Sequence, residues 1–376
     1  MTTPGSLSRH TPLAERFRTL GDVGLFAALS DPERIVGAAR RLSRLAYEAD
    51  ELGWFLSLIS AAGLGVPILA RHVPEPASAL GCLLADAIGG RAVLAVGITE
   101  RTAGSDVSSM RTTVTRDANG VLRLNGSKWH VTNAPIAGAL IVFAIDATTD
   151  DRFMTTVVVK PDDPGVRCGP PLDLIGCKGS PTGEIFLENV PLATERIVGR
   201  AEDGRGLLEL AFVRERVLAP WPLLGKMERV LEECLDHIEA REQFGKPLHE
   251  FQYVQEKIVS SFEQLIHARH LAERAVGSVA AGKPEAAIAS LAKATAADAA
   301  AHTFRAAIEI FGSYGVQSDR LYGDFLNDAI CAQIAGGTRE THKKVVFGEL
   351  RLERARARRG RPCRLLRDES GDGADE

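Results

Sequence analysis

Glu215 raises the question of acid–base chemistry, because it stands between Arg214 and Arg216 in the stretch LAFVRERVLA. A glutamate in an arginine-rich helix is usually a solvated partner in surface ion pairs, and such pairs contribute little to stability. Burial against a substrate would instead raise the pKa of its carboxyl towards the range of a general base. Pro220 and Pro222 would then kink the helix about one turn after the base and help to orient its carboxylate.

Several glycine-rich turns carry groups suited to an anion or to the edge of a flat ring. In GITERTAGSDV (97–107) a strand ends in a Gly-Ser-Asp turn, whose amides and Ser105 hydroxyl suit a phosphate or a flavin edge. Taken alone, such a pattern is more typical of a capped turn without a ligand. Five further segments stand out with it by their order along the chain: LNGSKWHVTNA (124–134), GCKGSPTGEIFLENVPL (176–192), AREQFGKPLHEFQ (240–252), EIFGSYGV (309–316) and IAGGTRETHKKV (334–345).

Several classes of function are disfavoured by composition. The charge balance of 45 Lys plus Arg against 49 Asp plus Glu gives no reason to expect nucleic-acid binding. There is no GxGxxG after a strand, no GxxxxGK[ST], and no HExxH or carboxylate cluster, so we expect no metal site. No apolar run is long enough to span a bilayer, and the first residues lack the apolar core of a signal peptide. The six cysteines are scattered without CxxC spacing, which fits reduced thiols in the cytoplasm.

The sequence changes character twice and predicts an α+β protein of three parts. Residues 1–92 have helical periodicity and form a predicted N-terminal helical domain. Residues 93–200 contain short runs rich in Val, Ile, Phe and Thr between Gly, Pro, Asp and Asn, which is typical of an antiparallel β domain. Residues 201–360 return to helical periodicity and predict a bundle, and 361–376 predict a disordered tail.

The order of these segments resembles that of the acyl-CoA dehydrogenase family of flavoproteins. That family shows TExxAGSD, NGxKxxxTN, GxRxSxTxxxxFxxVxVP, RxxFGxxxxxxQ, QxxGGxG and a final GTxEI. This chain has TERTAGSD, NGSKWHVTN, GCKGSPTGEIFLENVPL, REQFGKPLHEFQ, EIFGSYG and GGTRET in the same order. The match covers roughly residues 90–350 and implies an N-terminal helical domain, a middle β domain and a C-terminal four-helix bundle. It also implies FAD at the β–bundle junction, and a homodimer or homotetramer.

The resemblance implies two sets of FAD-binding residues. Those implied to contact the flavin and the dinucleotide are Ile98, Thr99, Gly104, Ser105, His130, Thr132 and Thr338. Arg241 and Phe244 match residues that reach the FAD of a neighbouring subunit, and the same motifs include Gln252, Glu309 and Gly312.

This chain departs from the family pattern at four positions. His130 stands where Trp is frequent, Glu309 replaces a Gln, Ser313 replaces a Gly, and Asn327 replaces an Arg. These changes either weaken FAD binding or retune it. A carboxylate near a pyrophosphate is repelled, so we expect Glu309 to turn away or to pair with an arginine. The N-terminal block is also shorter than in the family, by about 25 to 30 residues.

The catalytic residues are implied by a comparison within the family. Many members carry the base as the Glu of a YEGT turn, but here that turn reads Ala335-Gly336-Gly337-Thr338. The isovaleryl and long-chain branches instead carry a Glu-Arg pair on an earlier helix, and Glu215-Arg216 matches it. We therefore expect Glu215 to take the α proton of an acyl thioester, while the flavin N5 accepts the β hydride. The Gly336 N–H is the candidate donor to the thioester oxygen, and the expected substrate contacts are Ser105 and Arg216.

The leading hypothesis is therefore FAD-dependent α,β-dehydrogenation of an acyl thioester on CoA or on an acyl carrier protein, with an electron-transfer flavoprotein or oxygen as acceptor. Two other functions stay open on the same fold. One is a monooxygenase or other oxidase, which needs no carboxylate base. The other is a non-catalytic assembly or binding protein. The acyl chain and the electron acceptor are not encoded in any motif found here.

Overall fold

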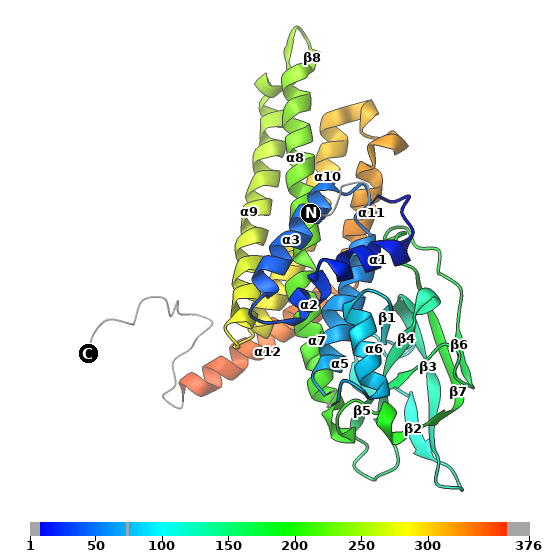
Figure 1. Ribbon diagram of the computed structural model, residues 1–376. Helices are drawn as coiled ribbons and strands as arrows, with labels where there is room; N and C mark the ends of the chain where they lie inside the picture. The colour runs from blue at the N-terminus through cyan, green and yellow to red at the C-terminus, as the bar shows by residue number, and fades with distance from the viewer. Residues whose placement is uncertain (1–7, 73–74, 359–376) are drawn as a thin grey trace.

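The computed structural model describes residues 8–72 and 75–358. In chain order they form helices, a sheet and a second set of helices (Figure 1). The sheet lies at one end of an elongated molecule, and the long helices α8 and α9 extend away from it (Figure 1).

The first helical block packs between the sheet and the bundle. Its helices are α1 (Leu13–Asp22), α2 (Leu25–Ser30), α3 (Ile35–Glu48), α4 (Trp54–Leu58), α5 (Val66–Ala70) and α6 (Ala79–Ile88). A π-helical segment, Ile59–Gly65, joins α4 to α5, and all seven of its residues are buried. A Cβ on Gly65 would stand 2.8 Å from the Leu94 side chain of the sheet, and one on Gly63 would stand 2.8 Å from Leu218 of the bundle. Glycine therefore lets this segment fit closely between the two.

The middle block is a mixed sheet. Its strands are β1 (Leu94–Gly97), β2 (Thr113–Arg116), β3 (Leu122–Thr132), β4 (Ala139–Asp146), β5 (Met154–Val159), β6 (Val166–Cys168) and β7 (Thr182–Leu192), in the order β1-β4-β2-β3-β7-β6 with β5 also on β4. Four pairings are antiparallel, as predicted, but β1–β4 and β2–β4 are parallel. The expectation of a purely antiparallel domain is corrected here. The strand β4 is joined to each of these partners through a long connection rather than a hairpin, which permits parallel pairing.

Asn133 ties the sheet to the first helical block. Its side-chain amide donates to the backbone oxygens of Ser57 (3.0 Å) and Leu94 (3.1 Å), and its Oδ1 accepts from the Ser57 hydroxyl. The residue is fully buried, so these bonds are shielded from water. The end of β3 is thereby fixed relative to both α4 and β1.

The last block is a helical bundle with a central alanine-rich helix. Its helices are α7 (Gly204–Leu218), α8 (Pro220–Ala240), α9 (Gln252–Ala280), α10 (Ala286–Phe311), α11 (Tyr322–Ala332) and α12 (Arg339–Ala357), and a short hairpin of β8 (Glu242–Gln243) and β9 (Lys246–Pro247) joins α8 to α9. Small buried alanines let α10 pack closely against its neighbours. The chain passes from α7 to α8 at Ala219, and Pro220 begins the new helix five residues after Glu215.

The two helical blocks share one apolar core, which also covers one face of the sheet. A smaller apolar cluster lies within the sheet domain. The predicted boundaries at residues 92 and 200 fall between Ile88 and Leu94 and between Leu192 and Gly204, but the division into domains stays a prediction. The predicted tail, 361–376, lies outside the described residues.

Candidate active site

Glu215 and its two arginine neighbours are all buried, at 5–6% exposure. Consecutive residues of an α-helix point in directions about 100° apart, so the three side chains diverge. Arg214 donates to the backbone oxygens of Leu29 (3.3 Å) and Ser30 (3.2 Å) at the end of α2. Arg216 donates to the Ser290 hydroxyl of α10 at 3.3 Å. A solvated surface role for Glu215 is therefore excluded.

The Glu215 side chain lines a cavity of about 60 Å³ at the meeting point of the three blocks. Most of the wall is apolar and includes Phe55, Ile59 and Leu223. Four titratable side chains lie among these residues: Cys177, Glu215, Lys293 and Asp328. Oε2 of Glu215 makes no hydrogen bond to any residue that the structure describes. An unpaired carboxylate oxygen at an apolar cavity is free to act on a bound group.

Gly336 lies directly against this carboxylate. A Cβ at position 336 would overlap both carboxylate oxygens of Glu215, and the backbone there has φ +67°. A glycine meets both demands, because it has no side chain and adopts positive φ without strain. The structure therefore brings together the two residues predicted to be catalytic, although 120 positions separate them in sequence.

The electrostatics of Glu215 balance burial against two cations. Burial raises the pKa of its carboxyl, while the charges of Lys293 and Arg216 lower it. Lys293 is itself buried, which lowers its pKa, and its ammonium donates to the Gly337 carbonyl at 3.0 Å. The net pKa of Glu215 is raised, as expected for a general base working near neutral pH. The sequence reasoning missed Lys293, because it lies in an alanine-rich helix with no motif around it.

The predicted flavin-facing residues cluster at one open edge of the sheet. Thr99 follows β1 and its carbonyl accepts from the Trp129 N–H at 2.8 Å. A bulge in β3 follows Lys128, and His130 there is exposed with φ +52°. Bulges redirect side chains, which accounts for this unusual backbone. The remaining members of this cluster are the half-buried Ile98 and Thr132.

The turn after β1 is also accessible. Gly104 and Ser105 are exposed, and no atom lies within 4 Å of the position that a Cβ on Gly104 would take. The pKa of the next residue, Asp106, is lowered mainly by the Ser108 hydroxyl and to a lesser degree by the charge of Lys344 of α12. Open backbone, hydroxyl groups and a nearby cation fit a phosphate-bearing, planar cofactor such as FAD.

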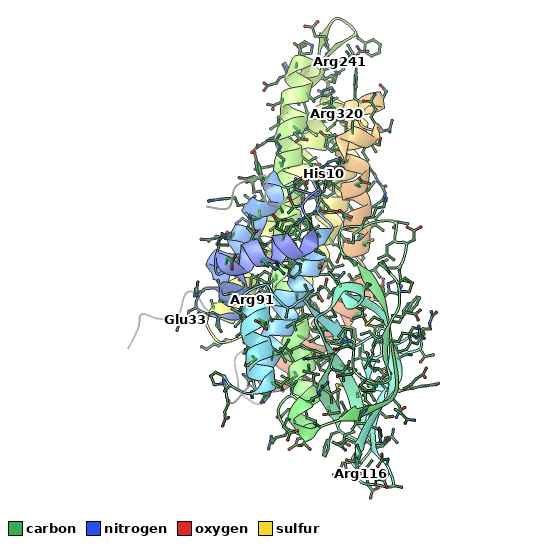
Figure 2. All side chains as sticks on the ribbon, turned by 45° about the vertical axis from the view of Figure 1, so that its right-hand side comes forward. His10, Glu33, Arg91, Arg116, Arg241 and Arg320 are labelled. Carbon is green, nitrogen blue, oxygen red and sulfur yellow. The ribbon has the colours of Figure 1, made fainter. Side chains whose placement is uncertain are left out.

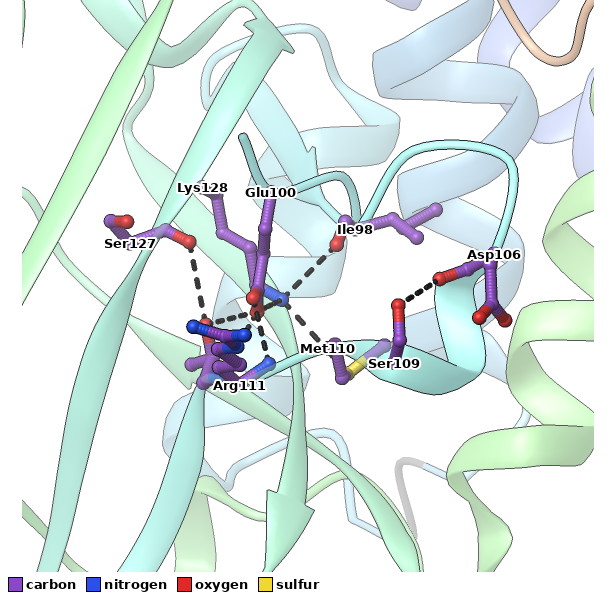
Figure 3. Close-up of polar contacts among 9 residues, drawn as sticks. Ile98, Glu100, Asp106, Ser109, Met110, Arg111, Ser127 and Lys128 are labelled. Atoms are coloured by element: carbon purple, nitrogen blue, oxygen red, sulfur yellow. Dashed lines mark hydrogen bonds and ion pairs between the residues drawn. The ribbon is translucent and has the colours of Figure 1, made fainter. Parts of the chain in front are cut away.

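A buried ion pair between Glu100 and Lys128 holds the residues that follow β1 (Figure 3). The Lys128 ammonium donates to Glu100 Oε1 at 2.9 Å and to the Ile98 carbonyl at 3.1 Å. Glu100 also accepts from Thr112, through its N–H (2.9 Å) and its hydroxyl (2.6 Å), and from the Arg111 N–H (2.7 Å). The pair fixes the end of β1 where the flavin-facing residues begin. Both residues lie in the quoted motifs, but their spacing along the chain gave no sign that they pair.

The second predicted cofactor set lies at the far end of the bundle. Arg241 ends α8, Phe244 is 94% exposed on the β8–β9 hairpin, and Gln252 is the exposed first residue of α9. Gly312 ends α10, and Glu309 lies one turn before it. Figure 2 shows Arg241 at one end of the molecule and Arg116 of the sheet at the other. Within one chain, this set does not meet the first set.

Glu309 pairs with Lys257 of α9, so the expectation that it turns away or binds an arginine is corrected to a lysine partner. The reason is helix packing, since α9 and α10 run side by side and place these two residues opposite each other.

The other predicted residues have identifiable local roles. Thr338 caps α12, where its hydroxyl accepts from the Thr341 N–H at 3.4 Å. Arg216 lies over the Phe212 ring at 5.1 Å, and neither Arg216 nor Ser105 is among the residues lining the cavity. Asn327 is half-buried and packs through its backbone against Gly176. The roles assigned to these residues stay predictions.

A helical block, a mixed sheet and a bundle that enclose a buried carboxylate define the architecture of a flavoprotein dehydrogenase. The chain belongs to the acyl-CoA dehydrogenase family. The model of the acyl-CoA dehydrogenase middle domain matches residues 95–190, and that of the acyl-CoA dehydrogenase C-terminal domain matches residues 202–350.

Individual relatives share much of the chain. The short-chain-specific acyl-CoA dehydrogenase of Megasphaera elsdenii is 32% identical over 68% of this chain and 67% of its own length. The L-prolyl-[peptidyl-carrier protein] dehydrogenase of Pseudomonas fluorescens is 30% identical over 68% of this chain and 67% of its own length. The structure of butyryl-CoA dehydrogenase from Megasphaera elsdenii superimposes with a TM-score of 0.81 at 27% identity, covering 89% of each chain.

These similarities confirm the predicted family, the α+β fold, the oxidoreductase class and FAD as the family's cofactor. In the part of the chain that the structure describes, no helix is long and apolar enough to cross a membrane, and no three metal-ligating side chains cluster. A cytoplasmic location stays a prediction.

Proposed function

We propose that this chain removes the α and β hydrogens of a short acyl thioester, with Glu215 as the base. The observation that carries the proposal is the buried carboxylate of Glu215, which faces an apolar cavity with one oxygen unpaired. The α proton of a thioester is only weakly acidic, so its removal needs a carboxylate held within hydrogen-bond reach.

The residues around Glu215 have separate proposed roles in the reaction. In the deprotonated state its carboxylate takes the α proton as the α C–H bond breaks. Lys293 and Arg216 stabilise the charged form before the reaction, and the apolar wall excludes water. The Gly336 N–H, in the turn against the carboxylate, is the proposed donor to the thioester oxygen as negative charge develops there.

The residues proposed to hold FAD are those at the sheet edge. Ile98, Thr99, His130 and Thr132 would line the ring, and the Gly104–Ser105 turn would meet the phosphates. When bound, FAD supplies the acceptor for the hydride that leaves the β carbon. The Glu100–Lys128 pair holds this edge in place.

The second cofactor set supports a proposal about assembly. Arg241 lies at the opposite end of the molecule from the sheet, too far away to serve the same chain's sheet edge (Figure 2). Phe244 and Gln252 lie on the hairpin and at the helix start that follow it. A homodimer or a homotetramer would bring this set to the sheet edge of another subunit. The 94% exposure of an aromatic side chain, Phe244, fits a contact that forms only on assembly.

The cavity is half-open, so the proposal of a small acyl group is drawn from the relatives rather than from its volume. One relative is described as short-chain specific, and another acts on a prolyl group tethered to a carrier protein. The proposal covers thioesters of CoA and of a carrier protein. It also covers oxygen and an electron-transfer flavoprotein as the electron acceptor.

The buried base favours dehydrogenation over the alternatives. A monooxygenase on this fold has no need of a carboxylate in the acyl cavity, and a non-catalytic homologue has no reason to keep one buried and unpaired. Maintaining a buried carboxyl costs desolvation energy, which binding of a reacting group would offset.

The test is anaerobic titration of the full-length FAD-bound protein with butyryl and palmitoyl thioesters, each on CoA and on a carrier protein. We expect the butyryl thioester to bleach the visible flavin absorbance and to yield the enoyl thioester, two hydrogens lighter by mass spectrometry. Palmitoyl thioesters and free butyrate should leave the spectrum unchanged. A flavin that no short thioester bleaches, or a product that has gained an oxygen atom, would contradict the proposal.

A further inference from the structure

Two cysteines far apart in sequence meet at the wall of the cavity. Cys177 lies in the loop between β6 and β7, and Cys331 lies near the end of α11. The two side chains lie close enough for each thiol to shift the pKa of the other, and Cys177 also lines the cavity. Neither forms a disulfide in the structure. The contact depends on no feature assigned above to catalysis or to FAD.

The backbone holds these two thiols together. The Cys177 N–H donates to Asp328 Oδ1 at 2.5 Å, and Asp328 precedes Cys331 by one helical turn. A Cβ on Gly176 would stand 2.5 Å from the Asn327 carbonyl, so only glycine lets the loop approach α11 so closely. Because these contacts do not involve sulfur, they keep the two thiols close whichever redox state the pair has.

The two thiols have different surroundings. Cys331 is half-buried, and the neighbouring Cys177 side chain and Gly176 N–H lower its pKa to about 7. Cys177 is 6% exposed, and its pKa is raised by the neighbouring Cys331 side chain and by burial. Cys331 is therefore both the more accessible thiol and the one whose pKa is lowered. This is the asymmetry of an attacking thiol and a resolving thiol.

We propose that Cys177 and Cys331 form a dithiol that hydrogen peroxide oxidises to a disulfide. The Cys331 thiolate attacks one peroxide oxygen; the O–O bond breaks, and the released hydroxide takes a proton to become water. Cys177 then loses its proton and attacks the sulfenic sulfur of Cys331; the S–S bond forms, and the departing hydroxide takes up that proton. In sum, two thiols and one peroxide give one disulfide and two waters.

The test treats the full-length FAD-bound protein with hydrogen peroxide and analyses alkylated tryptic peptides by mass spectrometry. We expect a cross-linked peptide pair containing Cys177 and Cys331, two hydrogens lighter than the separate peptides and lost on reduction with dithiothreitol. Cys331→Ser should abolish the cross-link. Cys82→Ser, a change at an exposed cysteine elsewhere, should leave it intact.

A second variant separates the two steps. In Cys177→Ala the resolving thiol is gone, so peroxide should leave a sulfenic acid on Cys331 that dimedone labels. Wild-type protein should show little of this label. Dimedone labelling as strong in wild type as in Cys177→Ala, or cross-links of Cys331 to other cysteines only, would overturn the proposal. These readouts do not depend on acyl turnover, so they stand or fall apart from the proposed dehydrogenase activity.

Discussion

Glu215 and Gly336 compete for one position in space. The carboxylate of Glu215 lies where a side chain on residue 336 would begin. A carboxylate can therefore reach this part of the cavity from α7 or from the turn before α12, but not from both. The sequence comparison identified both positions, and the structure supplies the physical reason that a glycine accompanies Glu215.

This geometry predicts that the base can be moved. Glu215→Gly should lower the rate of flavin reduction by an acyl thioester about 10²- to 10⁴-fold. The double variant Glu215→Gly/Gly336→Glu should recover at least about tenfold of that loss, because the new carboxylate enters the space vacated by the old one. Recovery will be partial, since φ +67° strains a glutamate.

Stopped-flow absorbance measures this reduction, and Gly336→Glu alone is the control. That variant should be defective, because two side chains would overlap. A double variant that binds FAD but reduces it no faster than Glu215→Gly would argue against a shared position.

Lys293 should set the pH range in which Glu215 is active. Its charge lowers the pKa of the Glu215 carboxyl, so removing that charge raises this pKa further. The base must be deprotonated, and the acid limb of the pH–rate profile should therefore move to higher pH in Lys293→Gln. Glutamine keeps a donor for the Gly337 carbonyl.

Lys293→Arg is the matched comparison, because it keeps the charge and should keep the wild-type profile. The pH dependence of flavin reduction measures both variants. An acid limb that stays in place in Lys293→Gln would show that Lys293 does not tune the base.

Among the individual residues of the candidate site, the sequence identified those that stand in motifs, such as Glu215 and Gly336. It did not identify Lys293, whose importance arises only because α10 packs beside α7 and α12. It also left Cys177 and Cys331 as scattered thiols, because their contact depends on the packing of a loop against α11. Side chains that meet across the fold leave no local pattern to detect.

Helix packing around the site depends on close contacts at glycine. A Cβ on Gly225 of α8 would overlap the Ser43 carbonyl of α3, so the two helices are in close backbone contact at this point. Lys226 supports the same contact by donating to the Tyr47 carbonyl at 3.1 Å and to that of Ala49. The burial of Lys226 lowers its pKa to about 8.

We therefore expect Gly225→Ala to lower the free energy of unfolding by about 1–3 kcal/mol, since the added methyl group must push α3 from α8. Gly277→Ala in α9 is the matched control, because no atom lies within 4 Å of its Cβ position. That change should raise the free energy of unfolding by about 0.5–1 kcal/mol through helix propensity. Urea denaturation followed by circular dichroism compares them, and equal effects would refute the close-contact argument.

The sequence predicted the elements well where periodicity and motif order were strong. The sheet between two helical blocks follows from runs of β-branched residues between turn residues. The parallel pairing of β1 with β4 did not follow, because the pattern of a strand does not state which partner it will have. The π-helical segment Ile59–Gly65 was also missed, since its glycines respond to the crowding of Leu94 and Leu218.

The two proposed sets of FAD-binding residues lie at opposite ends of the molecule. If assembly completes the site, the FAD-bound protein should sediment as a dimer or larger. Phe244→Ala should weaken FAD binding, because it removes an aromatic contact offered to another subunit, and should leave the fold of the chain intact.

The control is Phe153→Ala, which removes a partly exposed aromatic side chain from the sheet domain instead. FAD fluorescence titration gives the affinities, and sedimentation velocity gives the mass. An FAD-loaded monomer of 40.4 kDa would contradict the assembly proposal.

The central claim, that Glu215 is the base, is tested most directly by comparing Glu215→Gln with Glu209→Gln. Both changes lie on α7, but Glu209 is exposed and pairs only with Arg205 at 3.4 Å among the described ion pairs, whereas Glu215 faces the cavity. The measurement is the anaerobic rate of flavin reduction by a short acyl thioester. Glu215→Gln should keep FAD and fold yet lose about 10²- to 10⁴-fold in this rate, while Glu209→Gln should match wild type. Undiminished reduction in Glu215→Gln would mean that the base lies elsewhere or that the reaction is not α,β-dehydrogenation.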